Sequence, residues 1–166
     1  MFYTIVDDLI LYQLISFIKR YTNFELKLRE YFAQKTEGIY PEFIIVINEF
    51  IFFFVKKKDY LKSQIHLKAM RRQISLRKII IIRTERILIN LLFSLFPDLN
   101  IDDIKIELDE ISGAREISIY FLFFKERGIA IGRNGDYIRA VNQIFEKYVI
   151  FENNNIPLKI KCKFKN

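Results

Sequence analysis

The fold is decided by the stretch Gly128-Ile129-Ala130-Ile131-Gly132-Arg133-Asn134-Gly135-Asp136-Tyr137-Ile138. Two of the chain's five glycines, Gly132 and Gly135, stand on either side of an Arg-Asn pair. An apolar segment precedes them, and an amphipathic helix from Asp136 to Tyr148 is predicted after them from apolar spacings of three and four. Glycine lets a backbone approach a ligand closely, and the N–H groups at a helix start can face phosphates. The stretch therefore predicts a phosphate-contacting loop between two helices; the alternative is a tight turn and nothing more.

The elements around this loop give an α+β fold. An apolar stripe predicts a helix over 87–96 that Pro97 ends. Alternating apolar and polar residues predict strands over 104–108 and 117–121, joined by a turn at Ser112-Gly113. After the second loop helix, residues 152–157 read as a loop and 158–162 as a third strand. The predicted order is α-β-β-α-α-β.

The first half of the chain gives weaker signals. Residues 1–36 read as two helices, the second with an N-cap at Thr22-Asn23. Residues 43–55 read as one or two strands, and Ile65, 74–76 and 79–82 as further short strands, which together suggest a small β-barrel. We expect a helical segment at 1–36, a basic β-rich region at 37–83 and the α-β-β-α-α-β domain at 84–166. No internal repeat is evident.

The positive charge is concentrated in one part of the chain. The net charge is +7, yet residues 56–86, here called the basic band, carry 11 basic and 2 acidic side chains. Such a concentration attracts polyanions, although a solvated charged face is the alternative. The candidate contacts within the basic band are Lys56, Lys57, Lys58, Lys62, Lys68, Arg71, Arg72, Arg77 and Lys78.

The composition argues against several classes of protein. One cysteine, Cys162, and one histidine, His66, provide neither a disulfide framework nor a multi-cysteine zinc site. We expect Cys162 to be buried, His66 to lie on the surface, and Phe52–Phe54 to belong to the core. No apolar run reaches about 18 residues, so no membrane span is predicted. We expect no enzyme activity, metal or cofactor.

The glycine loop in its setting resembles the Gly-x-x-Gly signature of a KH domain, and the element order is that of the prokaryotic-type (type II) KH fold. The resemblance implies binding of single-stranded RNA at the loop and in an apolar groove beside it. It places the RNA contacts at Ile129, Ile131, Gly132, Arg133, Asn134, Gly135, Tyr137, Ile138 and Arg139, with the strand 117–121 also lining the groove.

A longer resemblance covers residues 75–151 and is to the NusA family of transcription factors. It rests on Ile79-Ile80-Ile81-Ile82-Arg83-Thr84, on Phe96-Pro97-Asp98-Leu99, and on Ser112-Gly113-Ala114-Arg115 before the Gly-x-x-Gly loop. It implies a reduced protein with an OB-like barrel and a single KH domain. The implied function is transcription elongation or antitermination with RNA polymerase as partner.

An alternative resemblance is to the KH-bearing protein of the small ribosomal subunit. Arg127–Gly135 is similar to its signature, and Phe24–Phe32 to an early helix of that protein. It implies a structural component that binds rRNA. Residues with A/T-rich codons, such as Ile, Phe, Lys and Asn, are abundant, which favours an organelle genome, plastid or mitochondrial, or an A/T-rich bacterium. Asp7 and Asp8 near the start are unlike a transit peptide, so we expect the protein to be organelle-encoded.

Overall fold

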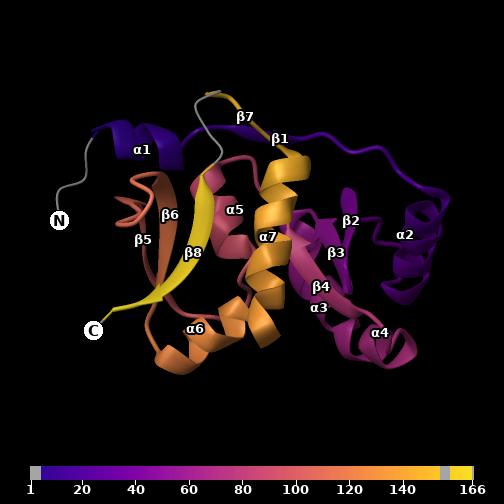
Figure 1. Cartoon of the computed structure of the whole chain (residues 1–166). Coiled ribbons are helices and arrows are strands. Elements are labelled where there is room, and N and C mark those ends of the chain that lie inside the picture. Colours follow the sequence, from indigo (N-terminus) through magenta and orange to yellow (C-terminus); the bar gives the residue numbers. More distant parts are fainter. Residues whose placement is uncertain (1–4, 154–157, 166) are drawn as a thin grey trace. The chain divides into compact units, whose positions relative to one another are not determined.

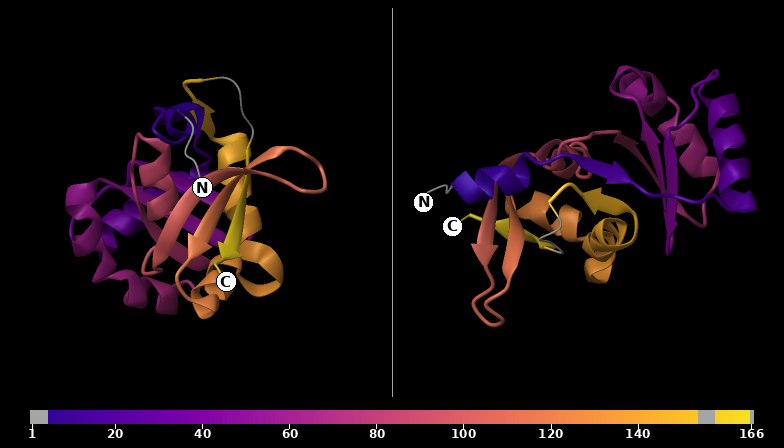
Figure 2. Two further views of the ribbon diagram at one scale, coloured as in Figure 1. Left: turned by 90° about the vertical axis from the view of Figure 1, so that its left-hand side faces the viewer. Right: turned by 90° about the horizontal axis from the view of Figure 1, so that it is seen from above.

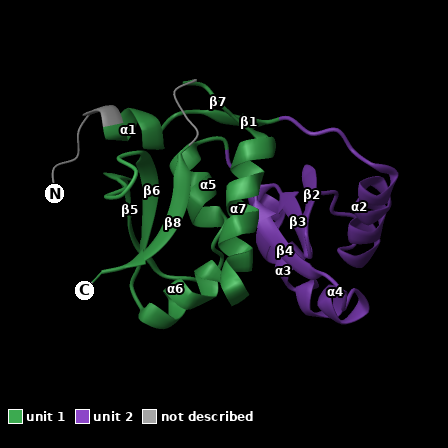
Figure 3. Cartoon of the chain, in the orientation of Figure 1, with its two compact units in different colours: residues 1–17, 86–166 green, residues 18–85 purple. Residues whose placement is uncertain are grey.

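The computed structural model describes residues 5–153 and 158–165. They form two compact units (Figure 3), unit 1 from residues 1–17 and 86–166 and unit 2 from residues 18–85. This division differs from the three expected segments. The helix expected within 1–36 after Thr22 joins the following strands in unit 2, and the residues before it join the C-terminal domain.

Unit 1 contains the predicted α-β-β-α-α-β order (Figure 1). Its core elements are α5 (Leu88–Ser94), β5 (Ile101–Leu108), β6 (Arg115–Phe121), α6 (Phe124–Ile131), α7 (Asp136–Lys147) and β8 (Lys159–Phe164). A short 3₁₀ turn, η2 (Arg133–Gly135), joins α6 to α7. The hairpin loop between β5 and β6 projects from this unit (Figure 2). The α+β class and the type II order are thereby confirmed.

The sheet of unit 1 has the strand order β5-β6-β8, with β5 antiparallel and β8 parallel to the central β6. Alternate residues point to opposite faces of the sheet. Ile117, Ile119 and Phe121 of β6 are at most 1% exposed and face the core. Phe96, which follows α5, packs edge-on against Phe121 with ring centroids 5.7 Å apart. The predicted apolar stripe of α5 is buried at Leu88, Leu91, Leu92 and Leu95.

The N-terminal helix is shorter than predicted. α1 covers Ile5–Leu11, and Ile15–Phe17 form the strand β1 instead of a helix; residues 1–4 lie outside the described part. β1 pairs antiparallel with β7 (Val149–Phe151), a strand that follows α7. The helix predicted for residues 14–18 from their periodicity is wrong, because strand pairing with a segment distant in sequence overrides local propensity.

Unit 2 is a three-stranded sheet with helices. It consists of α2 (Asn23–Lys35), β2 (Phe43–Ile47), β3 (Phe50–Val55), η1 (Lys57–Asp59), α3 (Tyr60–Gln64), α4 (Leu67–Gln73) and β4 (Lys78–Arg83). Thr22 caps α2 as predicted, in a reciprocal capping box with Glu25. Phe52, Phe53 and Phe54 are fully buried in β3, and the strand predicted at 79–82 lies in β4.

The expected small β-barrel is not found among the described residues. The strand order is β2-β3-β4, and β4 runs parallel to β3. Parallel neighbours need a crossover connection, usually helical, and α3 and α4 provide it. Ile65 lies between these helices and Ile74–Leu76 follow them, so neither forms the predicted strand. Met70 of α4 is buried in the core of unit 2 and Ile74 packs against that core, whereas Ile65 and Leu76 are exposed.

The two units share one topology, which the sequence did not indicate. In unit 2, α2-β2-β3-α3-α4-β4 has the same α-β-β-α-α-β order as α5-β5-β6-α6-α7-β8 in unit 1. In each unit, the central strand pairs antiparallel with the strand before it and parallel with the strand after the two helices. The chain therefore contains the same architecture twice, once in each unit, without an evident sequence repeat.

Candidate nucleic-acid interface

The loop between α6 and α7 has a backbone that few residues can adopt. Gly132 has φ 80° and ψ 174°, and Asn134 and Gly135 have φ 54° and 74°. A Cβ atom added to Gly132 would lie 2.8 Å from the main-chain N of Tyr137 and 2.9 Å from its Cβ. Glycine is therefore required at 132 both by its conformation and by the close approach of α7.

Hydrogen bonds hold this loop in one shape. The N–H of Gly132 donates to the carbonyl of Gly128 at 3.1 Å, and the N–H of Gly135 donates to the carbonyl of Gly132 at 3.2 Å. Arg139, one turn into α7, donates from Nη1 to the carbonyl of Asn134 at 2.6 Å. The predicted contact Arg139 thus also fixes the loop, while the neighbouring Arg133 side chain is exposed.

Tyr137 differs from its expected role as an RNA contact. The residue is buried, its hydroxyl donates to the carbonyl of Leu95, and its ring packs edge-on against Phe96 with centroids 5.8 Å apart. A phenol held in this way cannot reach a ligand in solvent. Tyr137 instead anchors the first turn of α7, and with it the glycine loop, to the core of unit 1.

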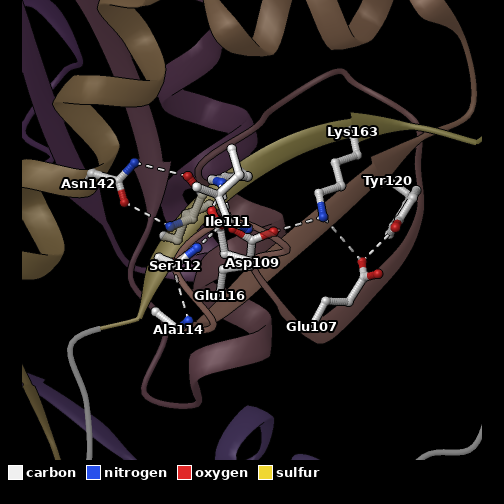
Figure 4. Close-up of polar contacts among 11 residues, drawn as sticks. Glu107, Asp109, Ile111, Ser112, Ala114, Glu116, Tyr120, Asn142 and Lys163 are labelled. Atoms are coloured by element: carbon white, nitrogen blue, oxygen red, sulfur yellow. Dashed lines mark hydrogen bonds and ion pairs between the residues drawn. The ribbon is translucent and has the colours of Figure 1, made fainter.

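Asn142 is a positioning residue that sequence reasoning missed. Its side-chain amide donates to the carbonyl of Ile160 at 3.0 Å and accepts from the N–H of Ile160 at 2.9 Å (Figure 4). These two bonds satisfy main-chain groups of the edge strand β8 and fix α7 against the sheet. The available signal was a polar amide beside the apolar stripe of the predicted helix, directly after Val141.

Apolar side chains that could contact RNA bases are accessible on α6 and α7, but not on the strand β6. Ile129, in the last turn of α6, is 54% exposed, and Ile131 and Ile138 on either side of the loop are half-buried. The strand 117–121 was expected to line the groove. Its apolar side chains are buried in the core, so the apolar surface near the loop comes from the two helices.

Two of the three lysines of β8, Lys161 and Lys163, are paired with carboxylates (Figure 4). Lys161 Nζ lies 2.5 Å from Asp109 Oδ2 and 2.8 Å from Glu116 Oε2, and Lys163 Nζ lies 2.8 Å from Glu116 Oε1. Tyr120 donates to Glu107 at 2.6 Å beside them. These paired charges offer little net attraction to a polyanion.

The same network shifts the pKa values of its members. The hydrogen bond from Lys161 is the main reason that the pKa of Asp109 lies well below its ordinary value, and it raises the pKa of Lys161. Burial alone would raise the pKa of Glu116, but hydrogen bonds from Lys161 and Lys163 outweigh it and lower that pKa. All three groups are therefore held in their charged forms at neutral pH.

The basic band lies almost wholly in unit 2, and its members differ in availability. Arg71 donates to the carbonyl of Ile79 from two nitrogens, Arg77 donates to the carbonyl of Asn48, and Lys78 lies 3.9 Å from Glu49. These three cations have intramolecular partners, so they are weaker candidates than predicted. The remaining side chains are exposed and, within the described residues, have no ion pair or hydrogen bond: Lys56, Lys57, Lys58, Lys62, Lys68 and Arg72.

The remaining candidates have unremarkable surroundings. His66 is half-buried at the start of α4. Cys162 is buried as expected, and burial raises the pKa of its thiol to about 12, which disfavours the reactive thiolate.

In the part of the chain that the structure describes, no cluster of three His, Cys, Asp or Glu side chains is placed to hold a metal ion. Over the same residues, no helix has the length and apolar character needed to cross a membrane.

Comparisons with known proteins agree with this geometry. Residues 98–166 match the family model of the KH domain. No curated protein matches the chain at a significant level. Among solved structures, the crystal structure of APE1850 superposes with a TM-score of 0.57 at 18% identity, over 87% of this chain and 100% of that chain. At this identity the likeness shows the fold alone. The family match and the loop geometry together establish that residues 98–166 form a KH domain.

Proposed function

We propose that the protein is a non-catalytic RNA-binding protein that holds single-stranded RNA at the Gly132–Gly135 loop. The observation that carries this proposal is the loop itself, in which Gly132, Asn134 and Gly135 all have positive φ at the N-terminus of α7. KH domains bind RNA by clamping the backbone of about four nucleotides at such a loop. Arg133 and Arg139 add positive charge beside the clamp.

The proposed binding mode divides the contacts by chemistry. The helix start and the two arginines contact phosphates, because main-chain N–H groups, the helix dipole and guanidinium groups all favour anions. The exposed side chain of Ile129 and the half-buried Ile131 and Ile138 contact unpaired bases. The paired lysines of β8 are excluded from the interface.

We propose transcription elongation or antitermination as the process, with RNA polymerase as the partner. The support is the sequence resemblance of Phe96-Pro97-Asp98-Leu99 and Ser112-Gly113-Ala114-Arg115 to the NusA family. In the structure these segments follow α5 and form the turn between β5 and β6. The segment 79–84 gives no support, because it belongs to a parallel pair of strands in unit 2 and closes no barrel among the described residues.

A second candidate function is that of a structural component of an organellar small ribosomal subunit. It is favoured by the similarity of Arg127–Gly135 to the signature of the KH-bearing ribosomal protein. For either role we propose an organelle, plastid or mitochondrion, as the site of action, from the abundance of residues with A/T-rich codons.

Co-sedimentation of the native protein tests the process. A lysate with tagged protein at its natural abundance is separated on a sucrose gradient, with and without RNase treatment. Transcription predicts that the protein migrates with RNA polymerase subunits, whereas the ribosomal role predicts migration with small subunits. Migration with neither particle would contradict both roles and leave RNA binding to be judged separately.

A further inference from the structure

We infer that the corner between α3 and α4 of unit 2 is a second binding surface for single-stranded RNA, which contacts phosphates through lysine and arginine side chains. The inference rests on the proposed RNA-binding function and extends it to a unit outside the matched residues 98–166. Its starting point is the shared topology. In unit 2 the α3–α4 corner occupies the place in the element order that the glycine loop has in unit 1.

The two corners differ in backbone conformation. Ile65 has φ −57° and ψ −32°, and His66 has φ −92° and ψ −7°, so both are right-handed and need no glycine. The glycine loop of unit 1 has three positive φ values instead. The tightly curved main chain that cradles phosphate in a KH loop is therefore missing from the α3–α4 corner. Any phosphate contact there must come from side chains.

Suitable side chains surround the corner. Lys62 and Lys68 lie three residues before and three residues after Ile65, and Lys58 and Arg72 lie one further turn away on either side. All four side chains are exposed, and none has an ion pair or hydrogen bond within the described residues. They are therefore free to exchange counterions for phosphates, which is the main source of RNA affinity for cationic surfaces.

Apolar side chains accompany these cations. Leu61 and Ile65 are 77% and 78% exposed and lie one turn apart, on the same face as Lys58 and Lys62. The opposite side of the helices packs on the core of unit 2 through Tyr60, Leu67 and Met70. An exposed face that alternates cationic and apolar residues suits single-stranded RNA, whose phosphates and unpaired bases are both accessible.

The charge balance between the units supports this assignment. Unit 2 carries 15 basic and 7 acidic side chains, a net charge of +8, whereas unit 1 carries 12 basic and 13 acidic side chains, a net charge of −1. The glycine loop thus belongs to a unit with almost no net charge, in which the positive charge near the loop is local, at Arg133 and Arg139. We therefore expect most of the non-specific electrostatic attraction for RNA to come from unit 2.

The test compares two full-length variants with equal changes in charge. One variant combines Lys58→Gln, Lys62→Gln, Lys68→Gln and Arg72→Gln at the corner. The control combines Arg20→Gln, Lys27→Gln, Arg29→Gln and Lys35→Gln, which removes four positive charges from unit 2 on and just before α2. Affinity for a 20-nucleotide poly(U) RNA is measured by fluorescence anisotropy between 50 and 300 mM salt, after circular dichroism shows that both variants are folded.

The corner variant is expected to flatten the plot of log affinity against log salt by about 0.7 per lost phosphate contact, up to about 2.8 for four contacts. The control should change this slope by less than about 0.7, which is the value for one phosphate contact. Equal changes in the two variants, or none in the corner variant, would overturn the inference. So would a corner variant that loses binding to vesicles with phosphatidylglycerol and keeps full RNA affinity.

A loop variant separates this inference from the proposed function. If Arg133→Asp with Asn134→Asp abolishes binding while the corner variant binds normally, the KH loop is the RNA site and the inference about unit 2 is wrong. If the loop variant binds normally and the corner variant does not, the proposed role of the loop is wrong and the inference about unit 2 stands.

Discussion

Replacing each loop glycine by alanine tests whether the loop has the glycine-dependent backbone geometry on which the proposed RNA binding depends. Gly132 lies in a region of φ and ψ that is essentially restricted to glycine, where another residue costs about 1–3 kcal/mol. Its added Cβ would also lie 2.8 Å from the main-chain N of Tyr137. Because the first turn of α7 must move to accommodate it, we add an overpacking cost of about 1–3 kcal/mol. Gly132→Ala should therefore destabilise the protein by about 2–6 kcal/mol.

The other glycines are matched controls. Gly113 has φ +69° in open surroundings, so Gly113→Ala should cost only the left-handed penalty of about 1–2 kcal/mol. Gly135→Ala should cost a similar amount, because its nearest neighbour is the flexible end of Arg139. Gly128 lies within α6 with an ordinary φ and open space, so Gly128→Ala should stabilise by up to about 1 kcal/mol.

Urea unfolding, monitored by circular dichroism, measures the change in the free energy of unfolding for all four variants. We expect Gly128→Ala to stabilise the protein, Gly113→Ala and Gly135→Ala to destabilise it moderately, and Gly132→Ala to be the most destabilising. A Gly132→Ala variant no less stable than Gly113→Ala would refute the close approach of the loop to α7. A Gly128→Ala variant that loses stability would refute the assignment of Gly128 to a helix.

Two further predictions concern the stability of unit 1. Leu91 of α5 is fully buried, so Leu91→Ala should cost about 2–5 kcal/mol in urea unfolding, whereas Phe93→Ala at a 42% exposed position should cost clearly less; equal losses would contradict the predicted orientation of α5. The lowered pKa of Glu116 means that its contribution to stability is present above the ordinary value of 4.5 and is lost as the pH falls below it, so the free energy of unfolding should fall on acidification and Glu116→Gln should reduce that fall. A pH dependence that is unchanged in Glu116→Gln would show that its ion pairs with Lys161 and Lys163 contribute nothing.

The C-terminal fold was predictable because several local signals agree. The stripe at Leu88, Leu91 and Leu92, the alternation along β5 and β6, and the glycine pair each indicate the same element order. These segments were correctly placed to within a few residues. The strand β1 was missed, because its partner β7 lies more than 130 residues away and no local pattern reports such pairing.

Unit 2 could not be predicted for a different reason. Its helices α3 and α4 are only 5 and 7 residues long, too short to show a helical period against a background of Ile and Lys. The short segment Ile74-Ser75-Leu76 therefore looked like a strand. The α3–α4 corner of unit 2 is also right-handed and has no glycine, so it lacks the signature by which a repeat could be recognised in the sequence.

The glycine loop was predicted from the sequence, whereas the surroundings of several candidate contacts were not. Gly132, Arg133, Asn134 and Gly135 form the loop as the sequence suggested. The burial of Tyr137 and the pairing of Arg71 with the carbonyl of Ile79 depend on tertiary contacts. Sequence alone shows which residue types are present, but the number of partners that each charge finds is a property of the folded chain.

RNA binding by a charge-reversed loop tests directly whether the Gly132–Gly135 loop contacts RNA. Arg133→Asp with Asn134→Asp places two carboxylates where the phosphates would lie, and Asp tolerates the positive φ of Asn134. Like charges about 4 Å apart repel by about 1 kcal/mol in bulk water and by about 4 kcal/mol near a protein surface. The control, Asn90→Asp with Lys165→Asp, makes the same change in net charge at exposed positions of unit 1.

The measurement is fluorescence anisotropy with single-stranded RNA, with circular dichroism melting of the same samples. We expect the loop variant to bind at least tenfold more weakly than wild type, since about 1.4 kcal/mol is one decade in affinity. We also expect the control to bind within about twofold, since about 0.4 kcal/mol is a factor of two. A folded loop variant that binds RNA as well as the control would contradict the account and reduce the Gly132–Gly135 segment to a turn between two helices.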